Sequence, residues 1–188
     1  MVDETILWEP SAERKESSSL WQFALATAEL HHCAPEDYAG LLEWSIKQPN
    51  QYYHALWDFL EIIGQKGAVA FEPGKTIRDA RFFPGAKLNY AQNMLANPDD
   101  TPAMIAHLND GQRREISRAQ LHNEVSRIVQ ALKGAGVKPG DRIAAIVTND
   151  IEATQFYLAS AAIGAIWASC SPDFGAAGAT DRLAQIAP

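Results

Sequence analysis

The sequence lacks clustered basic residues, and this absence narrows the possible partners. Its 188 residues contain 16 lysines and arginines against 23 aspartates and glutamates, a formal net charge of −7. No basic run is longer than the pairs Arg14-Lys15 and Arg113-Arg114. A nucleic-acid interface needs basic charge gathered on one surface, and an anionic membrane attracts the same kind of patch. We therefore expect neither a nucleic acid nor a membrane as a partner.

Long apolar runs are also absent. The longest uncharged stretch, residues 153–172, contains polar residues, and Gly164 divides it into a helical part and a strand-like part. A membrane span needs about 20 predominantly apolar residues, so we do not expect one. Residues 1–19 carry acidic side chains early and no apolar core, unlike a signal peptide. Cys33 and Cys170 lie far apart without a surrounding motif, which is typical of reduced thiols in a cytoplasmic protein.

Familiar catalytic motifs are missing as well. Gly134 and Gly136 come before a predicted strand and not after one, so they are interpreted as helix-cap and turn residues instead of a nucleotide-binding fingerprint. The run His31-His32-Cys33 offers three metal ligands, but a zinc site needs ligands from a second position, and no second cluster is present. Ser171 has no base nearby in the sequence. We predict no catalytic, ATP-binding or metal-binding residue in this chain.

The stretch from Pro139 to Pro172 carries the clearest fold signal. It predicts a strand over residues 143–147, a helix over 151–163 and a second strand that starts at 166. Strand, helix and strand in this order form a βαβ unit with parallel neighbouring strands, so the fold class is α/β. Ligands of such sheets bind at the carboxyl ends of the strands, which here are residues 148–150 and 169–173.

The flanking regions predict helices before this unit and a hairpin close to it. Residues 20–64 have the three-four spacing of a compact helical module rich in aromatics, whose simplest interpretation is core packing. A linker, residues 98–102, separates it from the rest. The predicted elements are helices over 20–31, from Pro35, from Pro49 to Gly64 and over 88–95, a hairpin over 103–116 with a turn at 109–111, a helix opened by the capping box Ser117–Gln120, and a last helix over 175–187.

Several segments together resemble the acetoacetyl-CoA synthetase family, in the acetyl-CoA synthetase branch of the adenylate-forming acyl-CoA synthetase superfamily. The match runs over nearly the whole chain and corresponds to the N-terminal part of those enzymes. The most specific segment is the last one. The segments are Leu7–Ser11, Trp44–Pro49, Phe83–Asn93, Gly140–Ala144 and Gly164–Gly175, the last followed by Asp181–Pro188.

The resemblance implies a fold and a chemistry. It implies a helical N-terminal cap over residues 1–100, followed over residues 101–188 by the beginning of a layered parallel-sheet AMP-binding domain that is incomplete. The family joins acetoacetate to CoA through an acyl-adenylate, with ATP, Mg²⁺ and CoA as cofactors and substrates. The phosphate loop, the nucleotide-binding motifs and the lysine-bearing C-terminal domain lie beyond Pro188 in the family pattern. We therefore expect the chain alone to be inactive and to bind none of these tightly, with the remaining domains of the same enzyme as its partner.

One family feature carries over to named residues. In relatives, the end of the strand before the Ser-Pro motif lines the tunnel for the pantetheine arm of CoA, and the matching positions are Trp167, Ala168 and Ser169. Relatives have glycines at the last two positions. The alternative interpretation is that Trp167 is a core residue and Ser169 ends a strand. Two further departures are Gln92 in place of a glutamate and Thr148–Asp150 in place of Pro-Asn.

Two other functions remain open from the sequence. One is a standalone, non-catalytic module that binds CoA or a partner chain. A strand beginning at Ile166 would leave an edge without charge or proline, which favours truncation or an obligate partner. The other is a helical interaction domain with Trp21, Trp44 and Trp57 in a binding groove.

Overall fold

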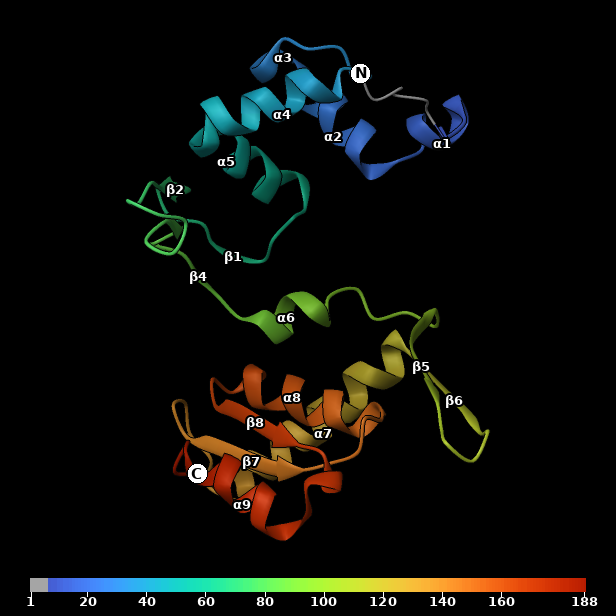
Figure 1. Cartoon of the computed structure of the whole chain (residues 1–188), viewed down its shortest axis with the longest axis vertical. Helices are drawn as coiled ribbons and strands as arrows, with labels where there is room; N and C mark the ends of the chain where they lie inside the picture. Colours follow the sequence, from blue (N-terminus) through green and yellow to red (C-terminus); the bar gives the residue numbers. More distant parts are fainter. Residues whose placement is uncertain (1–6) are drawn as a thin grey trace. The chain divides into compact units, whose positions relative to one another are not determined.

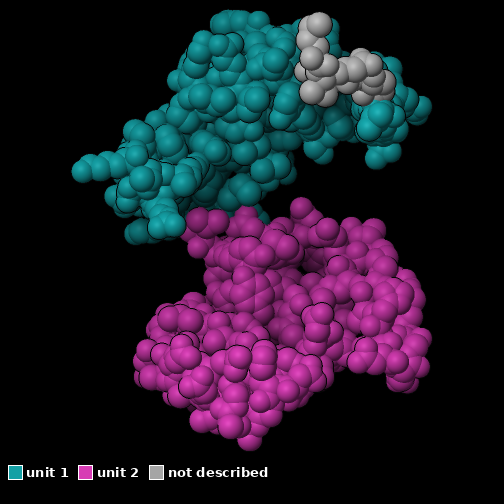
Figure 2. Space-filling view, viewed as in Figure 1, with its two compact units in different colours: residues 1–87 teal, residues 88–188 magenta. Residues whose placement is uncertain are grey.

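The computed structural model describes residues 7–188, which divide into two compact units (Figures 1 and 2). Unit 1 ends at Lys87 and unit 2 begins at Leu88. The domain boundary predicted near residue 100 stays a prediction. The described elements of unit 1 are α1 (Ala12–Glu16), α2 (Ser19–Ala26), α3 (Ala28–His31), α4 (Tyr38–Lys47), α5 (Pro49–Phe59), β1 (Gly64–Gln65), β2 (Phe71–Glu72), β3 (Arg81–Phe82) and β4 (Lys87–Leu88), the last of which crosses the boundary.

An aromatic cluster forms the core of unit 1. Phe23 of α2 and Trp44 of α4 are almost fully buried. The Phe23 ring lies 5.6 Å from Tyr52 and 5.2 Å from Phe59, both on α5 and both in edge-on geometry. Such pairs contribute more than their buried area alone. The interpretation of the helical-module aromatics as core is therefore right for Phe23, Trp44, Tyr52 and Phe59.

The helix starts and stops of unit 1 differ from those predicted. The helix expected over 20–31 is divided at Thr27, whose φ of −110° is outside the helical range and whose hydroxyl donates to the Phe23 carbonyl over 2.7 Å. The helix expected from Pro35 begins at Tyr38, because the Asp37 carboxylate caps it by accepting the Gly40 N–H over 2.8 Å. The helix expected to reach Gly64 ends at Phe59.

Short strand pairs complete unit 1, and one asparagine fixes them to a helix. β2 pairs antiparallel with β3, and β1 pairs with β4. The Asn50 side chain, near the start of α5, accepts the N–H groups of Ala70 and Phe71 over 3.0 and 2.9 Å. It also donates to the Phe71 carbonyl over 2.9 Å. One side-chain amide therefore satisfies three backbone groups at the start of β2.

Unit 2 contains the predicted βαβ element. β7 and β8 are parallel, with Ile143 opposite Trp167 and Ala145 opposite Ser169, and α8 connects them. The fold-class prediction is thereby confirmed. The described elements of unit 2 are α6 (Tyr90–Met94), β5 (Pro102–His107), β6 (Arg113–Ser117), α7 (Arg118–Gly134), β7 (Arg142–Ile146), α8 (Ile151–Ala162), β8 (Ile166–Cys170), a 3₁₀ turn (Pro172–Phe174) and α9 (Gly175–Ala184).

Three further predictions for unit 2 agree with the structure: the hairpin, the capping box and the role of Gly136. β5 and β6 form the antiparallel hairpin. The capping box is present: the Ser117 hydroxyl accepts the Gln120 N–H over 3.2 Å, and the Gln120 side chain accepts the Ser117 N–H over 2.8 Å. Gly136 has a φ of +89° just after α7 and before β7, as a helix-cap residue should.

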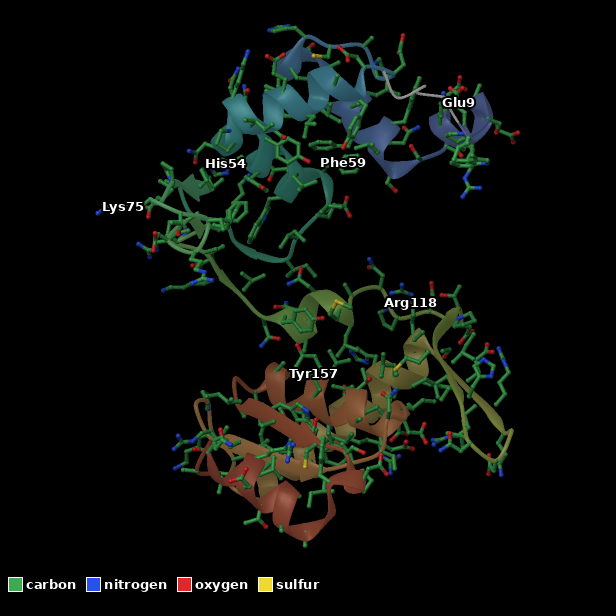
Figure 3. The ribbon with its side chains drawn as sticks, viewed as in Figure 1. Glu9, His54, Phe59, Lys75, Arg118 and Tyr157 are labelled. Atoms are coloured by element: carbon green, nitrogen blue, oxygen red, sulfur yellow. The ribbon has the colours of Figure 1, made fainter. Side chains whose placement is uncertain are left out.

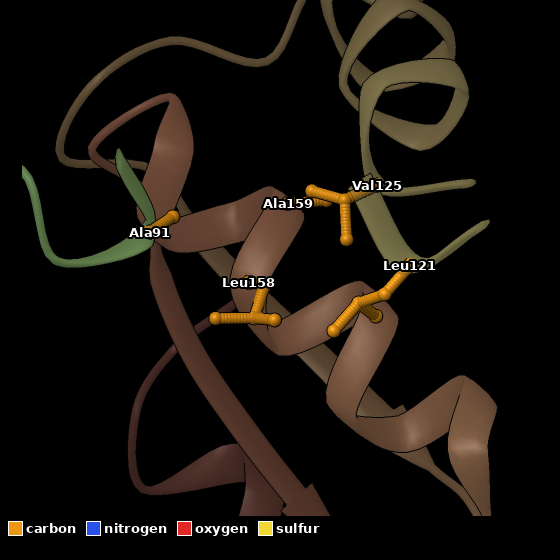
Figure 4. Packing of buried hydrophobic residues seen from close by; sticks show 5 residues of the cluster. All are labelled: Ala91, Leu121, Val125, Leu158 and Ala159. Carbon is orange, nitrogen blue, oxygen red and sulfur yellow. The ribbon is translucent and has the colours of Figure 1, made fainter. Parts of the chain in front are cut away.

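Small and aliphatic residues form the core of unit 2, mainly between helices (Figure 4). α6, α7 and α8 supply all five members of the buried cluster. No residue of β7 or β8 is fully buried. The members are Ala91, Leu121, Val125, Leu158 and Ala159.

Candidate functional site

The carboxyl ends of β7 and β8 meet beside the tip of the β5–β6 hairpin. The Val147 N–H donates to the Cys170 carbonyl over 3.1 Å, so the two chains stay paired just beyond β7. They then separate into two loops beside a cavity of about 420 Å³. This cavity, which we call the strand-end cavity, is lined by His107–Asn109 of the hairpin, Thr148–Asp150 after β7 and Ser171–Asp173 after β8.

Asp150 connects the loop after β7 to two neighbours. One carboxylate oxygen accepts the Ile151 N–H over 2.6 Å at the start of α8. The other accepts from Arg114 of β6 over 2.8 Å, and Arg114 also donates to Glu152 over 2.5 Å. The hydrogen bond from Arg114 lowers the pKa of Glu152 against the opposing effect of burial. The same bond raises the pKa of Arg114. This clamp holds the hairpin against α8 beside the strand-end cavity.

The loop after β8 is fixed by its own short hydrogen bonds. The Ser171 side chain caps the 3₁₀ turn by accepting the Asp173 N–H over 3.3 Å. The Ser171 hydroxyl also donates to the Asp173 carboxylate over 2.8 Å. Its proton is directed to a carboxylate and not to an imidazole, so the geometry gives no nucleophile–base pair of the serine-hydrolase type.

The strand-end cavity suits a neutral, hydrogen-bonding ligand better than an anion. In residues 7–188, the side chains of Asn109, Thr148 and Asn149 form no hydrogen bond, so their donors and acceptors are available to a ligand. Two carboxylates, of Asp150 and Asp173, also line the cavity, and no lysine or arginine does. Amide and hydroxyl groups of a ligand can pair with such a lining, whereas a phosphate group would meet like charge.

The three residues assigned to CoA by resemblance lie on β8, before the cavity. The Trp167 ring stacks on Phe156 of α8, with centroids 6.3 Å apart and planes at 20°. Ala168 is half-buried and Ser169 is exposed. None of the three lines the strand-end cavity, although their strand leads directly to Ser171. Both sequence interpretations of Trp167 remain compatible with this packing, because the ring contacts α8 and is still partly accessible.

The hairpin tip is the part of the site that the sequence did not indicate. The Asn-Asp-Gly signal correctly predicted a turn, but a turn signal carries no information about which distant loop it faces. The bond between Arg114 and Glu152 joins residues 38 positions apart. Nothing in the local sequence of Arg113-Arg114 distinguished one of these arginines as a clamp.

The histidine–cysteine run has a structural arrangement. His31 is buried in unit 1, where its Nε2 lies 2.9 Å from the Ala24 carbonyl. Its Nδ1 accepts the Cys33 N–H over 3.0 Å, so Nε2 carries the proton and donates. Both ring nitrogens are therefore occupied by the backbone. Across residues 7–188, no three or more His, Cys, Asp or Glu side chains are grouped to hold a metal ion.

The three tryptophans proposed for a groove do not share a surface. Trp44 is only 4% exposed in the core of unit 1. Trp57 packs on Phe83, with ring centroids 4.8 Å apart. Trp21 borders an open cavity, which Trp8 also lines. The groove hypothesis is wrong as stated, because Trp44 is not available to a partner.

No helix in the described part of the chain is long and apolar enough to cross a membrane.

Comparison with known proteins identifies the relatives of this chain. A family model described as "AMP-binding enzyme" matches residues 91–188. Acetoacetyl-coenzyme A synthetase of Rhizobium meliloti (strain 1021) is 38% identical over 188 residues, which are 100% of this chain and 29% of that protein. Malonamoyl-CoA synthetase vrtB of Penicillium aethiopicum is 34% identical, over 98% of this chain and 26% of that protein.

A solved structure shows the same relationship. Acetoacetyl-CoA synthetase from Streptomyces lividans superposes with a TM-score of 0.83 at 32% sequence identity, over 98% of this chain and 29% of that chain. The chain therefore spans less than a third of the length of these relatives. The resemblance inferred from the motifs is confirmed, and since the family model covers just over half of the residues, this chain belongs to the AMP-binding enzyme family.

Proposed function

We propose that this chain is the N-terminal part of an ATP-dependent acid–CoA ligase that converts acetoacetate, ATP and CoA to acetoacetyl-CoA, AMP and pyrophosphate through an acyl-adenylate. The observation that carries this proposal is the TM-score of 0.83 over 98% of the chain to a protein named as an acetoacetyl-CoA synthetase. Mg²⁺ and a cytoplasmic location belong to the same proposal and rest on the family resemblance. Residues 1–100 would form the cap domain, and residues 101–188 the first part of the AMP-binding domain.

The role proposed for unit 2 is to form one side of the path for CoA. Trp167, Ala168 and Ser169 would contact the pantetheine arm along β8. Beyond them, the strand-end cavity offers the amides of Asn109 and Asn149 and excludes anions by Asp150 and Asp173. The pantetheine arm is neutral and carries amides and a hydroxyl, so its chemistry fits this lining, whereas the phosphates of CoA would lie elsewhere.

The partner proposed for the βαβ element is the remainder of the ligase. β7 and β8 pair only with each other among the described strands, and a two-stranded sheet is marginal by itself. Ile146 and Ile166 are 54% and 53% exposed. Further strands beside β7 or β8 would bury these side chains. The alternative, a separate module that binds CoA or a partner, would need to cover the same surface with a different protein.

A chimera tests the proposal. We would replace the matching N-terminal residues of the Rhizobium meliloti protein with this chain and measure acetoacetate-dependent ATP–pyrophosphate exchange and thioester formation. We expect both activities in the chimera and neither in the 188-residue chain alone. A folded chimera that is inactive with acetoacetate and other short acids would contradict the ligase assignment, and CoA binding by the chain alone would favour the separate module.

The same chimera tests the CoA path separately. Ser169→Phe adds bulk at the exposed position on β8, so we expect the KM for CoA to rise at least about tenfold while pyrophosphate exchange is unchanged. Ser169→Ala, which changes the same position without adding bulk, is the matched control. Equal losses of exchange and thioester formation in Ser169→Phe would show that Ser169 acts on folding and not on CoA.

A further inference from the structure

Unit 2 has a second cavity, lined by residues other than those of the strand-end cavity. Its volume is about 210 Å³, and α6, β5, α7 and α8 all contribute to it. The buried side chains of Leu121 and Leu158 lie in its wall, with exposures of 8% and 4%. The remaining lining residues include two methionines and two tyrosines whose rings lie 5.8 Å apart: Met94, Met104, Tyr90 and Tyr157.

One cation, Arg118, lines this mainly apolar cavity. Arg118, the first residue of α7, is exposed, and Figure 3 shows it together with Tyr157 in unit 2. Among residues 7–188, no carboxylate lies within ion-pair distance of its guanidinium group and the group forms no hydrogen bond. The pKa of nearby Asp99 is lowered chiefly by its hydrogen bonds with Thr101 and, to a smaller extent, by the charge of Arg118. The Asp99 carboxylate is already engaged by the hydroxyl and the N–H of Thr101.

Polar groups that could receive a ligand accompany the arginine. Thr154 and Tyr157 also line the cavity, and their hydroxyl groups form no hydrogen bond within the described part of the chain. A guanidinium group is a strong donor to carboxylates, and hydroxyl groups add further donors. A ligand that fits this cavity therefore needs an apolar tail to pack against the wall and one negative charge to pair with Arg118.

We propose that this cavity is a binding site for a short-chain monocarboxylate, with its hydrocarbon tail against Leu121 and Leu158 and its carboxylate toward Arg118. The volume is below the roughly 300 Å³ of drug-sized sites, which limits the ligand to acids of about four to six carbons. Met94 and Met104 are flexible enough to adapt to small differences in tail shape. The inference depends on this cavity alone and not on the proposed ligase function.

Methionine methyl NMR tests this site in the 188-residue chain. The sequence has three methionines, Met1, Met94 and Met104, of which the last two line the cavity. After labelling of the methionine methyl groups with ¹³C, we would titrate butanoate and hexanoate. We expect saturable shifts of the Met94 and Met104 signals with a dissociation constant of about 1 mM. Absence of any shift at about 20 mM acid would overturn the proposal.

Charge and volume controls distinguish a built site from unspecific contact. Butanamide has the same shape without the charge, so we expect it to bind at least about tenfold more weakly, as should butanoate to Arg118→Gln. Thr154→Leu fills part of the cavity and should abolish the shifts with the arginine intact. Equal binding of butanoate and butanamide, or unchanged binding to Arg118→Gln, would refute a carboxylate site. Circular dichroism of each variant would verify that it is folded.

Discussion

The two units of this chain bury different kinds of side chain. Unit 1 is centred on aromatic rings, with Trp44 between His31 and Tyr52 at centroid distances of 5.2 Å each. Unit 2 is centred on a cluster with two alanines, Ala91 and Ala159, both at 0% exposure. Alanines permit close approach of α6, α7 and α8, whereas rings fill space between helices that are short and interrupted. The core of unit 1 therefore depends on a few large aromatic side chains, whereas the core of unit 2 depends on the close approach of α6, α7 and α8.

The units also end their helices differently. α7 and α8 each end in the same two backbone hydrogen bonds, with Gly136 and Gly164 in the left-handed conformation that this motif requires. α5 of unit 1 forms the same pair of bonds, from Glu61 to the Asp58 carbonyl and from Ile62 to the Trp57 carbonyl. Its left-handed residue, however, is Glu61, at a φ of +51°. The hydrogen bonds alone can therefore form without glycine, at a conformational cost.

Each unit uses one asparagine side chain to connect distant segments. Asn89 of unit 2 caps α6 by accepting the Gln92 N–H over 3.1 Å. It also donates to the last carbonyls of α8, those of Ala161 and Ala162, over 3.1 and 3.0 Å. Asn50 has a comparable role in unit 1 but lies in the first turn of its helix. The Asn89 side chain therefore lies between the start of α6 and the carbonyl end of α8, whereas Asn50 lies only at the start of a helix.

The same substitution at both asparagines should have unequal effects. Asn89→Asp keeps the cap on α6 but loses two donated hydrogen bonds and places a negative charge against the carbonyl end of α8. We expect it to lower the free energy of unfolding by about 2–3 kcal/mol, measured by urea denaturation. Asn50→Asp loses one donated bond, and its charge at the start of α5 is favourable, so we expect a loss of about 1 kcal/mol or less.

Hydrogen–deuterium exchange provides the control for this pair. Asn89→Asp should increase exchange at the end of α8 and in α6, and Asn50→Asp only around β2. If both variants lost the same stability, neither the helix-dipole argument nor the unequal number of lost hydrogen bonds would explain the result, and the comparison would be contradicted.

Replacing Glu61 by glycine tests whether the end of α5 is strained. Glu61→Gly removes the side chain from a left-handed position and a negative charge from a helix C-terminus. We expect the free energy of unfolding to rise by about 0.5–1 kcal/mol, after the greater flexibility of the unfolded glycine chain is subtracted. Thermal unfolding followed by circular dichroism would measure this.

Gly136→Ala in unit 2 is the reciprocal variant. It introduces a side chain at a φ of +89° with nothing within 4 Å of its added carbon, so only backbone strain acts. We expect a loss of about 1 kcal/mol. Stabilisation by Gly136→Ala, or destabilisation by Glu61→Gly, would contradict the common explanation of the three helix ends.

These helix ends show how far the sequence determines the fold. Gly136 and the capping box of Ser117 and Gln120 were recognisable because each uses the residue type that its backbone conformation prefers. The end of α5 was placed too late because Gly64 supplied a plausible stop signal, while Glu61 occupies the left-handed position without one. Sequence patterns identify a conformation only where the residue present is the preferred one.

Only part of the candidate site could likewise be predicted from the sequence. The loops after β7 and β8 were predictable, because parallel strands must end at the same edge of a sheet. The contribution of His107 and Asn109 was not, since it depends on the clamp from Arg114 to Asp150 and Glu152. Long-range ion pairs leave no periodic pattern in a sequence. The assignment of Trp167, Ala168 and Ser169 to CoA came from resemblance and stays a prediction.

The smallest expected effect concerns two ion pairs, one in each unit. In unit 1, Lys15 donates to Glu9 over 2.5 Å, and the two residues are six positions apart. In unit 2, Arg114 and Glu152 are 38 positions apart. The pKa of Glu9 is lowered chiefly by its hydrogen bond with Lys15, as the pKa of Glu152 is by its bond with Arg114. Only the second pair connects separate elements, the hairpin and α8, so only it should affect unfolding measurably.

Arg114→Met tests this expectation through its pH dependence. A carboxyl group whose pKa is lower in the folded state stabilises the fold above its ordinary value, here 4.5, and loses this contribution as the pH falls through the lowered pKa. We therefore expect Arg114→Met to lower the urea midpoint slightly at about pH 7 and to approach the unsubstituted chain at a pH below the lowered pKa of Glu152, where this carboxyl group is protonated in both. Lys15→Met, the matched control, should leave the midpoint unchanged at both values, because it releases no second element. An equal deficit of Arg114→Met at both pH values would mean that the arginine acts by packing, and that the hairpin is held beside the strand-end cavity without the ion pair.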